Sequence, residues 1–365
     1  MKVSVTHHNG AQSGGYHDCL RAAKHDIVSG VTVTDPVIAQ YLRNSWKRSY
    51  ELGIHPEDRR LSRHDHPLFV IDDDDRLFSA IVDQEINAIW ESFGGEHWAV
   101  YCTNAKAVIV RARHGSNPRA RAFALHVGRR IQECDVGTTA PACVLHEKVA
   151  ITLVGAEHYL NEFADMFCCA VPVWGPWGTL IGVLNVTGSE TFKSRLVVHK
   201  LQSAAIKIEN RLFLAAHDMN LVFKIHHDAD FINTHLAGLV AVNAFGDVLS
   251  ATRNALEMFA PIDPLGKRIN VAELFVDGFI ATQGYCQKTS LRNGIVFYTQ
   301  ACIGEASHAL IEDVAVTRNA SLRERADLHI LDIVRQCGGN ISKAARVLGL
   351  SRTTLYRTLN RKAGD

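Results

Sequence analysis

The 365-residue chain has 47% hydrophobic and 21% charged residues and a formal net charge of +1, an ordinary balance for a globular protein of two or three domains. No apolar run reaches the length of a membrane span, and the first residues lack the apolar core of a signal peptide. Nine cysteines are scattered without a CxxC pair, which argues against a zinc ribbon and a secreted disulfide framework. The sequence therefore predicts a cytoplasmic protein with reduced thiols, no membrane contact and no cofactor.

Two segments precede the first strand-like stretch. Residues 1–33 are polar and contain several Gly and His residues, so we expect a flexible N-terminal arm. Residues 34–60 hold a leading helix, which Asp35 and Pro36 open and Gly53 ends, with apolar side chains at helical spacing between them. We expect this helix to pack against the domain that follows.

Residues 61–215 alternate strand-like and helix-like segments. The clearest strands are Ala150–Val154, Phe167–Val173 and Leu180–Val186. The last two flank a Trp-Gly-Pro-Trp-Gly turn, which predicts a hairpin. Antiparallel strands with flanking helices predict an α+β sensor domain.

A long helical pattern closes this domain. From Ser194 to about Lys224, apolar residues recur every three or four positions. The pattern permits a short dimerising coiled coil, and it is equally compatible with a helix buried against its own domain. We interpret it as a signalling helix that ends the sensor at residue 215, followed by a linker, 216–229.

Residues 230–312 form a third predicted unit. Gly238–Asn243 and Val248–Ala251 make a predicted hairpin around a Phe-Gly-Asp turn, and the helix Arg253–Phe259 follows. Ile295–Cys302 is a later strand. This order predicts a second, smaller α+β domain.

After a polar linker, 313–323, residues 324–365 contain three short helical patterns separated by two glycine turns. The second pattern, Ile341–Leu348, buries Ala344 and Ala345, which are small enough to let a crossing helix approach closely. Glycine ends the first two helices because it reaches the left-handed conformation of a C-cap without a Cβ clash. This arrangement predicts a DNA-binding helix-turn-helix.

Charge supports that prediction. Residues 333–364 include seven Lys and Arg residues and no carboxylate, so the remainder of the chain is acidic. A basic excess concentrated on one small module is typical of phosphate contact. The third helix starts after Ser351, whose hydroxyl is placed to cap it; Leu355 faces inward, and Arg352 and Arg357 point outward.

This C-terminal pattern resembles the Fis-type helix-turn-helix of bacterial enhancer-binding regulators. The resemblance rests on the run Asn340-x-Ser342-x-Ala344-Ala345-x-x-Leu348-Gly349-Leu350-Ser351-Arg352-Thr353-Thr354-Leu355-Tyr356-Arg357. It implies a homodimer that reads a double-stranded DNA operator with its third helix in the major groove. The implied DNA-binding residues are Lys343, Arg346, Ser351, Arg352, Thr353, Thr354, Tyr356, Arg357 and Arg361. Arg352 and Arg357 suit guanine or phosphate, whereas Lys343 and Arg346 suit phosphate.

The sensor stretch resembles the GAF domain of regulators related to the acetoin-catabolism activator. The matching blocks arrive in the family's order: Asp135–Ala140, Gly155–Tyr159, Cys168–Val173 and Gly178–Val186. The runs Ser45-Trp46-x-Arg48 and Gly53-x-x-Pro56 are similar to the segment before that domain. Relatives commonly carry Gly-Thr-Asn-Ala where this chain has Gly137-Thr138-Thr139-Ala140-Pro141, so the ligand is expected to differ. Residues 230–312 look like a short PAS domain, whose expected role is to pair subunits.

A GAF domain usually encloses a small molecule between its sheet and a covering helix or loop, which implies a small-molecule effector. The candidate ligand-binding residues combine apolar walls with a few polar groups: Trp98, Tyr101, Cys134, Thr138, Thr139, Cys143, His158, Tyr159, Phe167 and Cys169. We interpret the pairs His146-Glu147 and Glu157-His158 as ordinary polar contacts rather than as a metal site.

The predicted fold class is therefore α+β and multidomain, with a GAF-type sensor, a PAS-like α+β domain and a C-terminal all-α Fis-type helix-turn-helix. The ATPase that such regulators place before the DNA reader is not expected, because the P-loop pattern is missing: Gly266-Lys267 is followed by Arg268, and Pro261 stands where the first glycine should be. We expect a regulator without enzymatic activity, which recruits RNA polymerase or occludes a promoter as its effector changes the dimer.

Three alternatives stay open. An enzyme with Cys143 or Cys169 as nucleophile would need a base or a positive field, which sequence spacing does not identify. Adjacent Cys168 and Cys169 suggest a thiol redox sensor, although neighbouring cysteines rarely bridge each other. An architectural DNA-binding protein would bind DNA identically with and without any metabolite.

Overall fold

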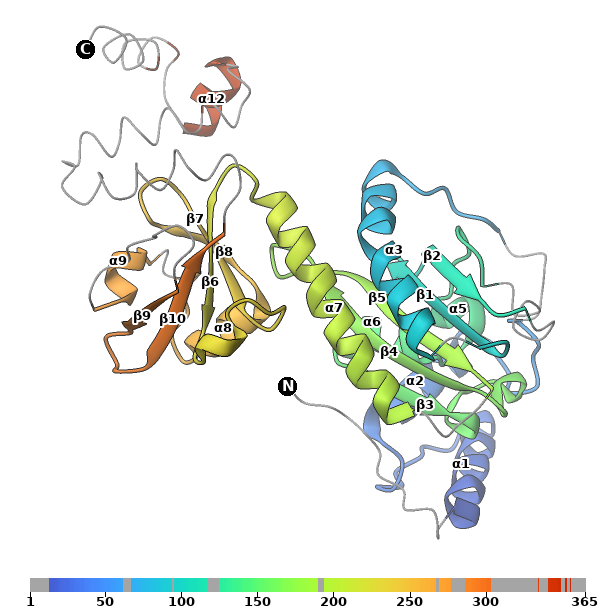
Figure 1. The fold of residues 1–365 in the computed structure, drawn as a ribbon. Helices are drawn as coiled ribbons and strands as arrows, with labels where there is room; N and C mark the ends of the chain where they lie inside the picture. The colour runs from blue at the N-terminus through green and yellow to red at the C-terminus, as the bar shows by residue number, and fades with distance from the viewer. Residues whose placement is uncertain are drawn as a thin grey trace, which may run out of the picture. The chain divides into compact units, whose positions relative to one another are not determined.

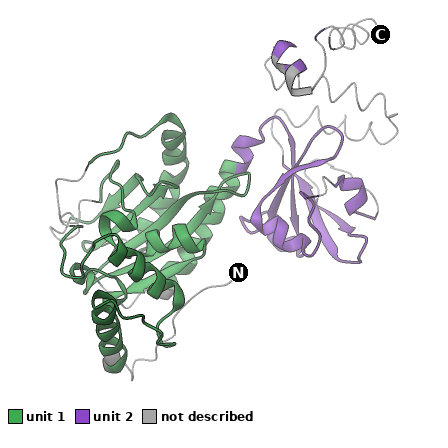
Figure 2. Cartoon of the chain, turned by 180° about the vertical axis from the view of Figure 1, so that it is seen from behind, with its two compact units in different colours: residues 1–212 green, residues 213–365 purple. Residues whose placement is uncertain are grey.

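The computed structural model describes residues 13–61, 67–93, 95–116, 125–189, 194–266, 269–276 and 286–302, then Val334, Ile341–Leu348, Arg352 and Leu355. The chain divides into two compact units, residues 1–212 and 213–365 (Figure 2). Each unit has its own sheet and its own core. Within the described residues, no helix combines the length and the hydropathy that crossing a membrane would require.

Unit 1 is built on a five-stranded antiparallel sheet with strand order β2-β1-β5-β4-β3 (Figure 1). Its strands are β1 (Trp98–Asn104), β2 (Ile109–His114), β3 (Ile151–Val154), β4 (Phe167–Trp174) and β5 (Leu180–Gly188). β4 and β5 form the predicted hairpin and pair in register from Phe167 opposite Gly188. The predicted α+β class with antiparallel sheets is confirmed.

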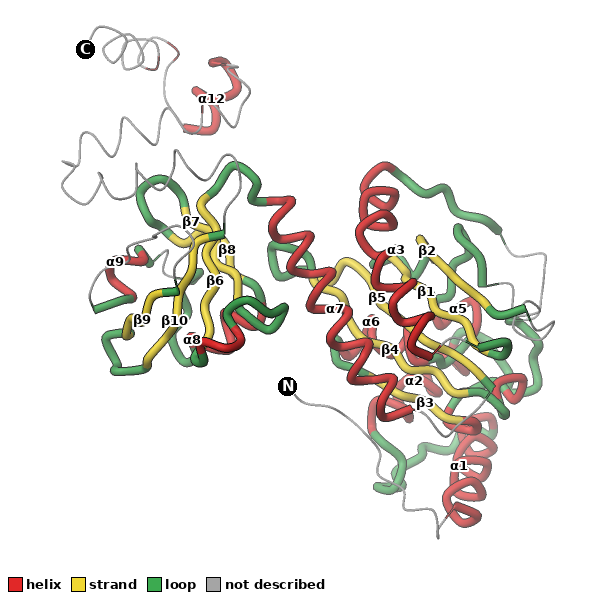
Figure 3. Tube along the Cα trace, in the orientation of Figure 1, coloured by secondary structure: helices red, strands yellow, loops and turns green. Residues whose placement is uncertain are grey.

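Side chains alternate between the two faces of this sheet, as the pleat of a strand requires. On β1, Trp98, Val100 and Cys102 belong to one hydrophobic cluster, whereas Ala99 and Tyr101 belong to the other. Helices cover both faces, so both clusters are buried (Figures 1 and 3). The first cluster lies under α3 (Asp73–Phe93) and α7 (Ser194–Ala216). The second lies under α1 (Ser13–Val28), α2 (Gln40–Glu51), α5 (Glu133–Val136) and α6 (Ala140–Glu147), with the short 3-10 helices η1 (Gly155–Glu157) and η2 (Asn161–Phe163) at its edge.

The N-terminal region differs from the flexible arm predicted for residues 1–33. Residues Ser13–Val28 form α1, and its Leu20, Ala23 and Ile27 are buried in the second cluster. Their spacing of three and four residues places them on one helical face, which explains why this segment packs. The leading helix begins at Gln40, later than predicted, and ends before Gly53, whose positive φ of 74° is the expected left-handed stop.

The long helix α7 ends at Ala216, one residue beyond the predicted end of the sensor, although the apolar pattern continues to about Lys224. Its Leu201, Ala205 and Ile208 are buried against the sheet of unit 1, so over this stretch the apolar stripe packs on its own domain. Residues Leu221–His226 form strand β6. The linker predicted at 216–229 is therefore wrong over these six residues, because they occupy the middle of the second sheet.

Unit 2 has a second five-stranded sheet with order β8-β7-β6-β10-β9, and the pairings between these strands are antiparallel. The strands are β6, β7 (Gly238–Val242), β8 (Val248–Ala251), β9 (Gln287–Ser290) and β10 (Val296–Ala301). The short helices are η4 (Ala229–Phe231), α8 (Arg253–Phe259) and α9 (Val271–Leu274). Three aromatic rings, Phe259, Phe275 and Phe297, pack together in its core.

The C-terminal segment contains helix α12, Ile341–Leu348, with the bounds that the sequence predicts. Ala344 and Ala345 are buried with Leu355, and Val334 and Ile341 pack against them. The adjacent alanines are therefore buried, as predicted. The caps and glycine turns predicted around α12 lie outside the described residues.

Candidate functional site

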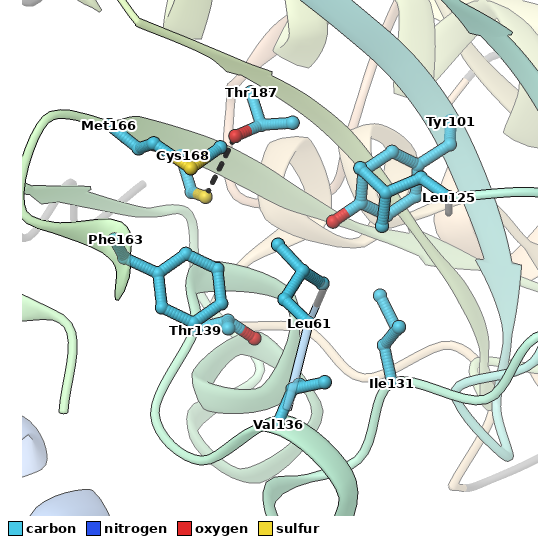
Figure 4. Close-up of a pocket in the computed structure, with 10 residues that line it drawn as sticks. All are labelled: Leu61, Tyr101, Leu125, Ile131, Val136, Thr139, Phe163, Met166, Cys168 and Thr187. Atoms are coloured by element: carbon cyan, nitrogen blue, oxygen red, sulfur yellow. Dashed lines mark hydrogen bonds between the residues drawn. The ribbon is translucent and has the colours of Figure 1, made fainter. Parts of the chain in front are cut away.

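A small pocket lined by buried side chains lies on the α5–α6 side of the unit 1 sheet (Figure 4). Its volume is about 10 Å³. That is the space of about one water molecule, so the pocket has no room for a larger ligand in this conformation. Six apolar and four uncharged polar side chains line it: Leu61, Leu125, Ile131, Val136, Phe163 and Met166, then Tyr101, Thr139, Cys168 and Thr187.

Each polar group of this cavity is oriented by a neighbour. Thr187 Oγ1 donates to the carbonyl of Phe167 at 2.9 Å and lies 3.2 Å from Cys168 Sγ (Figure 4). Thr139 Oγ1 caps α6 by accepting from the Ala142 amide at 3.4 Å. The hydrogen-bond network orients the Asn185 amide so that its oxygen accepts from Tyr101 Oη at 3.1 Å. The polar groups are therefore held in place before any ligand arrives.

Leu61 enters the cavity from an irregular segment, and two charged side chains hold its backbone. The Glu162 carboxylate accepts from the amides of Arg60 and Leu61, at 2.9 and 2.6 Å. The Arg129 guanidinium donates to the carbonyls of the same two residues, at 3.1 and 2.8 Å. Arg129 is 1% exposed, and this burial lowers its pKa. These four bonds hold the backbone of Arg60 and Leu61 beside the cavity.

Two consecutive threonines of the α5–α6 turn contact different parts of unit 1. Thr139 lines the cavity, whereas Thr138 Oγ1 lies 2.8 Å from Ser45 Oγ and 3.2 Å from Ser49 Oγ. Ser45 and Ser49 belong to α2 and are fully buried. A movement of this turn that follows a change in the cavity would therefore reach α2 directly.

The Ser45-Trp46-x-Arg48 run of α2 provides further bonds to the cavity wall. Ser45 Oγ donates to the Glu133 carboxylate at 2.5 Å, and Trp46 Nε1 donates to the carbonyl of Glu157 at 2.9 Å. Arg48 donates twice to Glu133, from Nε at 2.6 Å and from Nη2 at 2.8 Å. Glu133 lies on α5 and Glu157 on η1, so this run ties α2 to two elements around the cavity.

His158 lies behind the cavity wall. Its ring is fully buried and stacks on Phe163 at a centroid distance of 5.0 Å. Nδ1 lies 3.0 Å from the Gly155 carbonyl, which fixes the proton on that nitrogen. Burial lowers the pKa of His158 to about 4, so the ring is neutral at physiological pH.

The ten predicted ligand-binding residues fall into distinct places. Only Tyr101 and Thr139 line the cavity. Thr138, Cys143, His158 and Tyr159 are buried on the same side of the sheet without lining it. Trp98, Phe167 and Cys169 point to the opposite face, under α3 and α7. Cys134 lines a separate open groove of about 540 Å³ beside Arg48, Glu133 and His146.

The cavity is also lined by residues that are not among the ten predicted ligand-binding residues. On the strands these are Cys168, the neighbour of the predicted Cys169, and Thr187. Because side chains alternate along β4, one of the two adjacent cysteines must face the cavity. The strand register shows that this residue is Cys168. The remaining lining residues are apolar side chains from loops and short helices, which no motif marks.

The thiols of unit 1 are poorly suited to reactivity. Cys143, Cys168 and Cys169 are buried, and burial raises the pKa of each to about 12. The eight cysteines in the described part of the chain are free thiols. His146 Nε2 lies 3.5 Å from Glu133, and no cluster of potential metal ligands occurs among the residues that the structure describes.

Three of the predicted DNA-binding residues fall within the described part of the chain. Arg352 is helical and exposed, as predicted, while Lys343 and Arg346 lie on α12. The other six candidates, Ser351, Thr353, Thr354, Tyr356, Arg357 and Arg361, lie outside the described residues.

Comparison with known proteins identifies the class of the C-terminal segment first. Residues 329–361 match the model of the bacterial regulatory protein, Fis family. Longer similarities point to particular regulators. The acetoin catabolism regulatory protein of Cupriavidus necator is 24% identical over 232 residues, which cover 59% of this chain and 33% of that protein. MimR, the propane 2-monooxygenase operon transcriptional activator of Mycolicibacterium smegmatis, is 23% identical over 325 residues, covering 86% and 53% respectively.

A chain in the crystal structure of the E. coli DhaR(N)-DhaL complex has 12% identity and a TM-score of 0.42, covering 72% of this chain and 99% of that one. The protein is thus similar to the acetoin-catabolism group of bacterial regulators and carries a Fis-type C-terminal segment. It spans about a third to a half of the length of the two regulators named above.

Proposed function

We propose that this chain is a DNA-binding transcription regulator whose GAF-like unit 1 senses a small molecule and whose C-terminal helix-turn-helix reads an operator. The observation that carries the proposal is the Fis-family match over residues 329–361. The described part of that segment supports it, because α12 packs its alanine pair against Leu355 and leaves Arg352 exposed. The names of similar proteins, which include a transcriptional activator, agree with this function.

DNA contact is proposed for the nine basic and polar residues identified in the sequence. Seven Lys and Arg residues and no carboxylate occur in residues 333–364, so phosphate attraction favours this segment over the rest of the chain. A Fis-type reader acts as a homodimer on two half-sites about one helical turn apart. The PAS-like unit 2 is the proposed pairing element.

Effector sensing is proposed for the unit 1 cavity. Its uncharged polar groups are already oriented, and the Thr138–Thr139 turn joins it to α2. An effector that binds more tightly to one position of this turn would favour the matching position of α2. Operator affinity would then change by the free energy that couples effector binding to DNA binding. The buried thiols, with pKa values raised to about 12, do not favour redox sensing.

The proposed mode of action uses no nucleotide. The sequence contains no P-loop pattern to hold phosphates, so we propose recruitment of RNA polymerase or occlusion of a promoter. This role requires no catalytic residue.

Quantitative DNA binding tests the proposal. The purified protein is titrated onto fragments of its own genome at several salt concentrations, alongside the variant Arg357→Ala. A regulator selects a few fragments, and its affinity for them falls steeply with salt. Equal affinity for all fragments would support an architectural DNA-binding protein, and no binding at all would overturn the proposal.

A further inference from the structure

Glu85 is a buried carboxylate on α3, which covers the face of the unit 1 sheet opposite the cavity. It is 2% exposed, and its helix neighbours Val82, Ile86 and Ile89 belong to the apolar cluster under α3 and α7 (Figure 1). A carboxylate in such a place loses its hydration, so an apolar side chain would serve the packing as well or better. The charge of Glu85 therefore needs an explanation other than packing.

Two cations at the end of α7 face Glu85. Arg211 Nη2 donates to Oε1 at 2.5 Å, and Lys207 Nζ lies 3.6 Å from Oε2. Arg211 also donates from Nη1 to the carbonyl of Ile81, one turn earlier on α3, at 3.2 Å. Residues four apart lie on one face of a helix, so this face of α7 is held on α3 at a single carboxylate.

A further bond holds the end of α7 on the sheet. The Glu209 carboxylate accepts from the amide of Trp174, the last residue of β4, at 3.0 Å. Cys168, on the same strand, lines the cavity. The turn Lys207–Arg211 is therefore bonded both to α3 and to a strand that forms the cavity.

This turn is the last full turn of α7 within unit 1. Unit 1 ends at Leu212, and the helix continues to Ala216. The next residue, Phe213, is buried with Val222, Leu239 and Ala241 of unit 2. Because a helix is a rigid element, a displacement of residues 207–211 is passed on to Phe213.

The earlier turns of α7 are fixed by a different kind of contact. Val197, Leu201, Ala205 and Ile208 are buried in the apolar cluster of unit 1. Hydrophobic contact has no preferred direction, whereas a charge-assisted hydrogen bond has a defined geometry. The bonds of Glu85 therefore determine where on α3 the end of α7 lies.

We propose that Glu85 is a positioning residue for α7. Through Arg211 and Lys207 it fixes the helix end that enters unit 2, and it thereby keeps the two helix-turn-helix segments of a dimer at the spacing of the operator. The inference rests on the proposed function, since operator binding is one of its readouts.

This role predicts a specific loss in DNA binding. A dimer occupies two half-sites only while its DNA-binding segments keep their spacing. A less ordered α7 lowers the fraction of molecules with that spacing, and the apparent operator affinity falls by the same factor. Binding to DNA of random sequence depends on phosphate attraction and needs no fixed spacing, so it stays unchanged.

Two substitutions of Glu85 test this inference on the full-length chain. Glu85→Gln keeps the shape and removes the charge, whereas Glu85→Leu removes the hydrogen bonds as well. Water can hydrate Arg211 and Lys207 afterwards, since their side chains are 33% and 37% exposed. Replacing a buried ion pair by an apolar contact is often neutral or stabilising, so Glu85→Leu should unfold in urea at the wild-type concentration or above it.

Hydrogen–deuterium exchange of the amides of residues 208–216, measured by mass spectrometry, reports the order of the helix end. Both variants should exchange these amides at least about fivefold faster than the wild type, because local opening no longer breaks the bonds of Glu85. Faster exchange in a Glu85→Leu variant of undiminished stability cannot come from a loosened core. If Glu85→Leu does not fold, Glu85→Gln supplies the comparison.

The matched control is Asp83→Asn. Asp83 lies two residues away on α3 and pairs with Arg111 of β2 instead of with α7. This pair is partly exposed, so its loss should leave the exchange of residues 208–216 within about twofold of the wild type.

The same proteins are then titrated onto a fragment that the wild type selects and onto a fragment of random sequence, at one salt concentration. Both Glu85 variants should bind the selected fragment about tenfold more weakly and the random fragment within about twofold of the wild type. A residue with a structural role alone would change urea unfolding and leave this ratio unchanged at a temperature where every variant is folded.

The outcomes separate this inference from the proposed function. Wild-type exchange in both Glu85 variants, or faster exchange with an unchanged ratio of the two DNA affinities, would overturn the inference while the regulator proposal stands. If the wild type selected no fragment, the regulator proposal would fall and the operator part of this inference with it. The exchange data would then still decide whether Glu85 holds α7.

Discussion

Arg48 and Glu133 form a two-point ion pair that joins α2 to α5, with Nε 2.6 Å from Oε2 and Nη2 2.8 Å from Oε1. The carboxylate is 5% exposed and the guanidinium 31%. Ser45 donates to the same carboxylate at 2.5 Å. Helix α2 is thereby bonded to α5, whose Val136 lines the proposed effector site.

Removing the arginine should cost more than removing the carboxylate. Arg48→Ala leaves a buried negative charge whose partners are Ser45 and His146, with His146 Nε2 at 3.5 Å, so we expect a loss of about 3 kcal/mol in the free energy of unfolding. Glu133→Ala leaves a guanidinium that water can reach, and about 2 kcal/mol should be lost. Urea unfolding measures both. Lys47→Ala removes an exposed pair and should change stability by less than about 0.5 kcal/mol. An Arg48→Ala variant as mild as Lys47→Ala would contradict this ranking.

Thr138→Val should separate ligand binding from the response to it. The variant keeps the shape of Thr138 but loses its bonds to Ser45 and Ser49, while the adjacent Thr139 still lines the cavity. Effector affinity should stay within about threefold, and the effector-induced change in operator affinity should disappear. Thr152→Val, on β3, is the matched control, because its hydroxyl contacts Cys169 on the opposite face. A full response in Thr138→Val would exclude this route.

His158 should make the protein less stable in mild acid. Its pKa is about 4 in the folded protein against 6.5 in the unfolded chain, so the unfolded state binds more protons between these values. The contribution is fully present above pH 6.5 and is lost towards pH 4, at about 1.4 kcal/mol per pH unit. His158→Phe keeps a ring against Phe163 without titrating, and the fall in stability from pH 7 to pH 5 should shrink by about 1 to 2 kcal/mol.

The control for that measurement is His25→Gln, which alters an exposed histidine at the end of α1. Its unfolding free energy should depend on pH as the wild type's does. The same pH dependence in His158→Phe would show that other groups cause the acid sensitivity.

Thiol alkylation should follow burial. Cys286 is exposed, so it should react first with iodoacetamide among the described cysteines. Cys143, Cys168 and Cys169 should react only on unfolding, since each is buried with a pKa raised to about 12. Mass spectrometry of native and urea-treated protein resolves the sites. Rapid oxidation of Cys168 or Cys169 by peroxide in the native protein would support the alternative function of a thiol redox sensor.

Substitutions in the helix-turn-helix should affect DNA binding differently, depending on whether the residue contacts a base or a phosphate. Arg357→Ala should weaken operator binding by about 1 to 3 kcal/mol and relax selectivity at one base position if the guanidinium contacts a base edge. Lys343→Ala should weaken binding to all sequences alike and lower the salt slope by about one. Arg21→Ala, which removes an exposed side chain of α1, should change neither. A uniform loss with Arg357→Ala would make Arg357 a phosphate contact instead.

The sequence predicts some elements closely because local signals agree with packing. Helix α12 has its predicted bounds, since glycines flank it in the sequence and its alanine pair is buried. Strand β6 is different: its run Leu-Val-Phe-Lys-Ile-His follows α7 without a Gly or Pro, so the helical pattern continues into it. Only pairing with β7 and β10 makes this segment a strand.

The cavity was less predictable than the elements around it. Tyr101 and Thr139 follow from the GAF-like pattern, but Trp98 and Phe167 pack against each other, at a ring distance of 5.1 Å, on the opposite face of the sheet. An aromatic residue on a strand indicates that its side chain is buried, but it does not indicate on which face of the sheet. Leu61 carries no motif, because its place depends on contacts with Arg129 and Glu162, about 70 to 100 residues away.

Footprinting on genomic fragments at fixed salt, with and without a panel of neutral and charged metabolites, tests the central claim most directly. We predict a symmetric protected site whose occupancy changes with at least one metabolite in the wild type and with none in Thr138→Val. Binding that is indifferent to sequence and to every metabolite would contradict the account of this protein as an effector-responsive regulator.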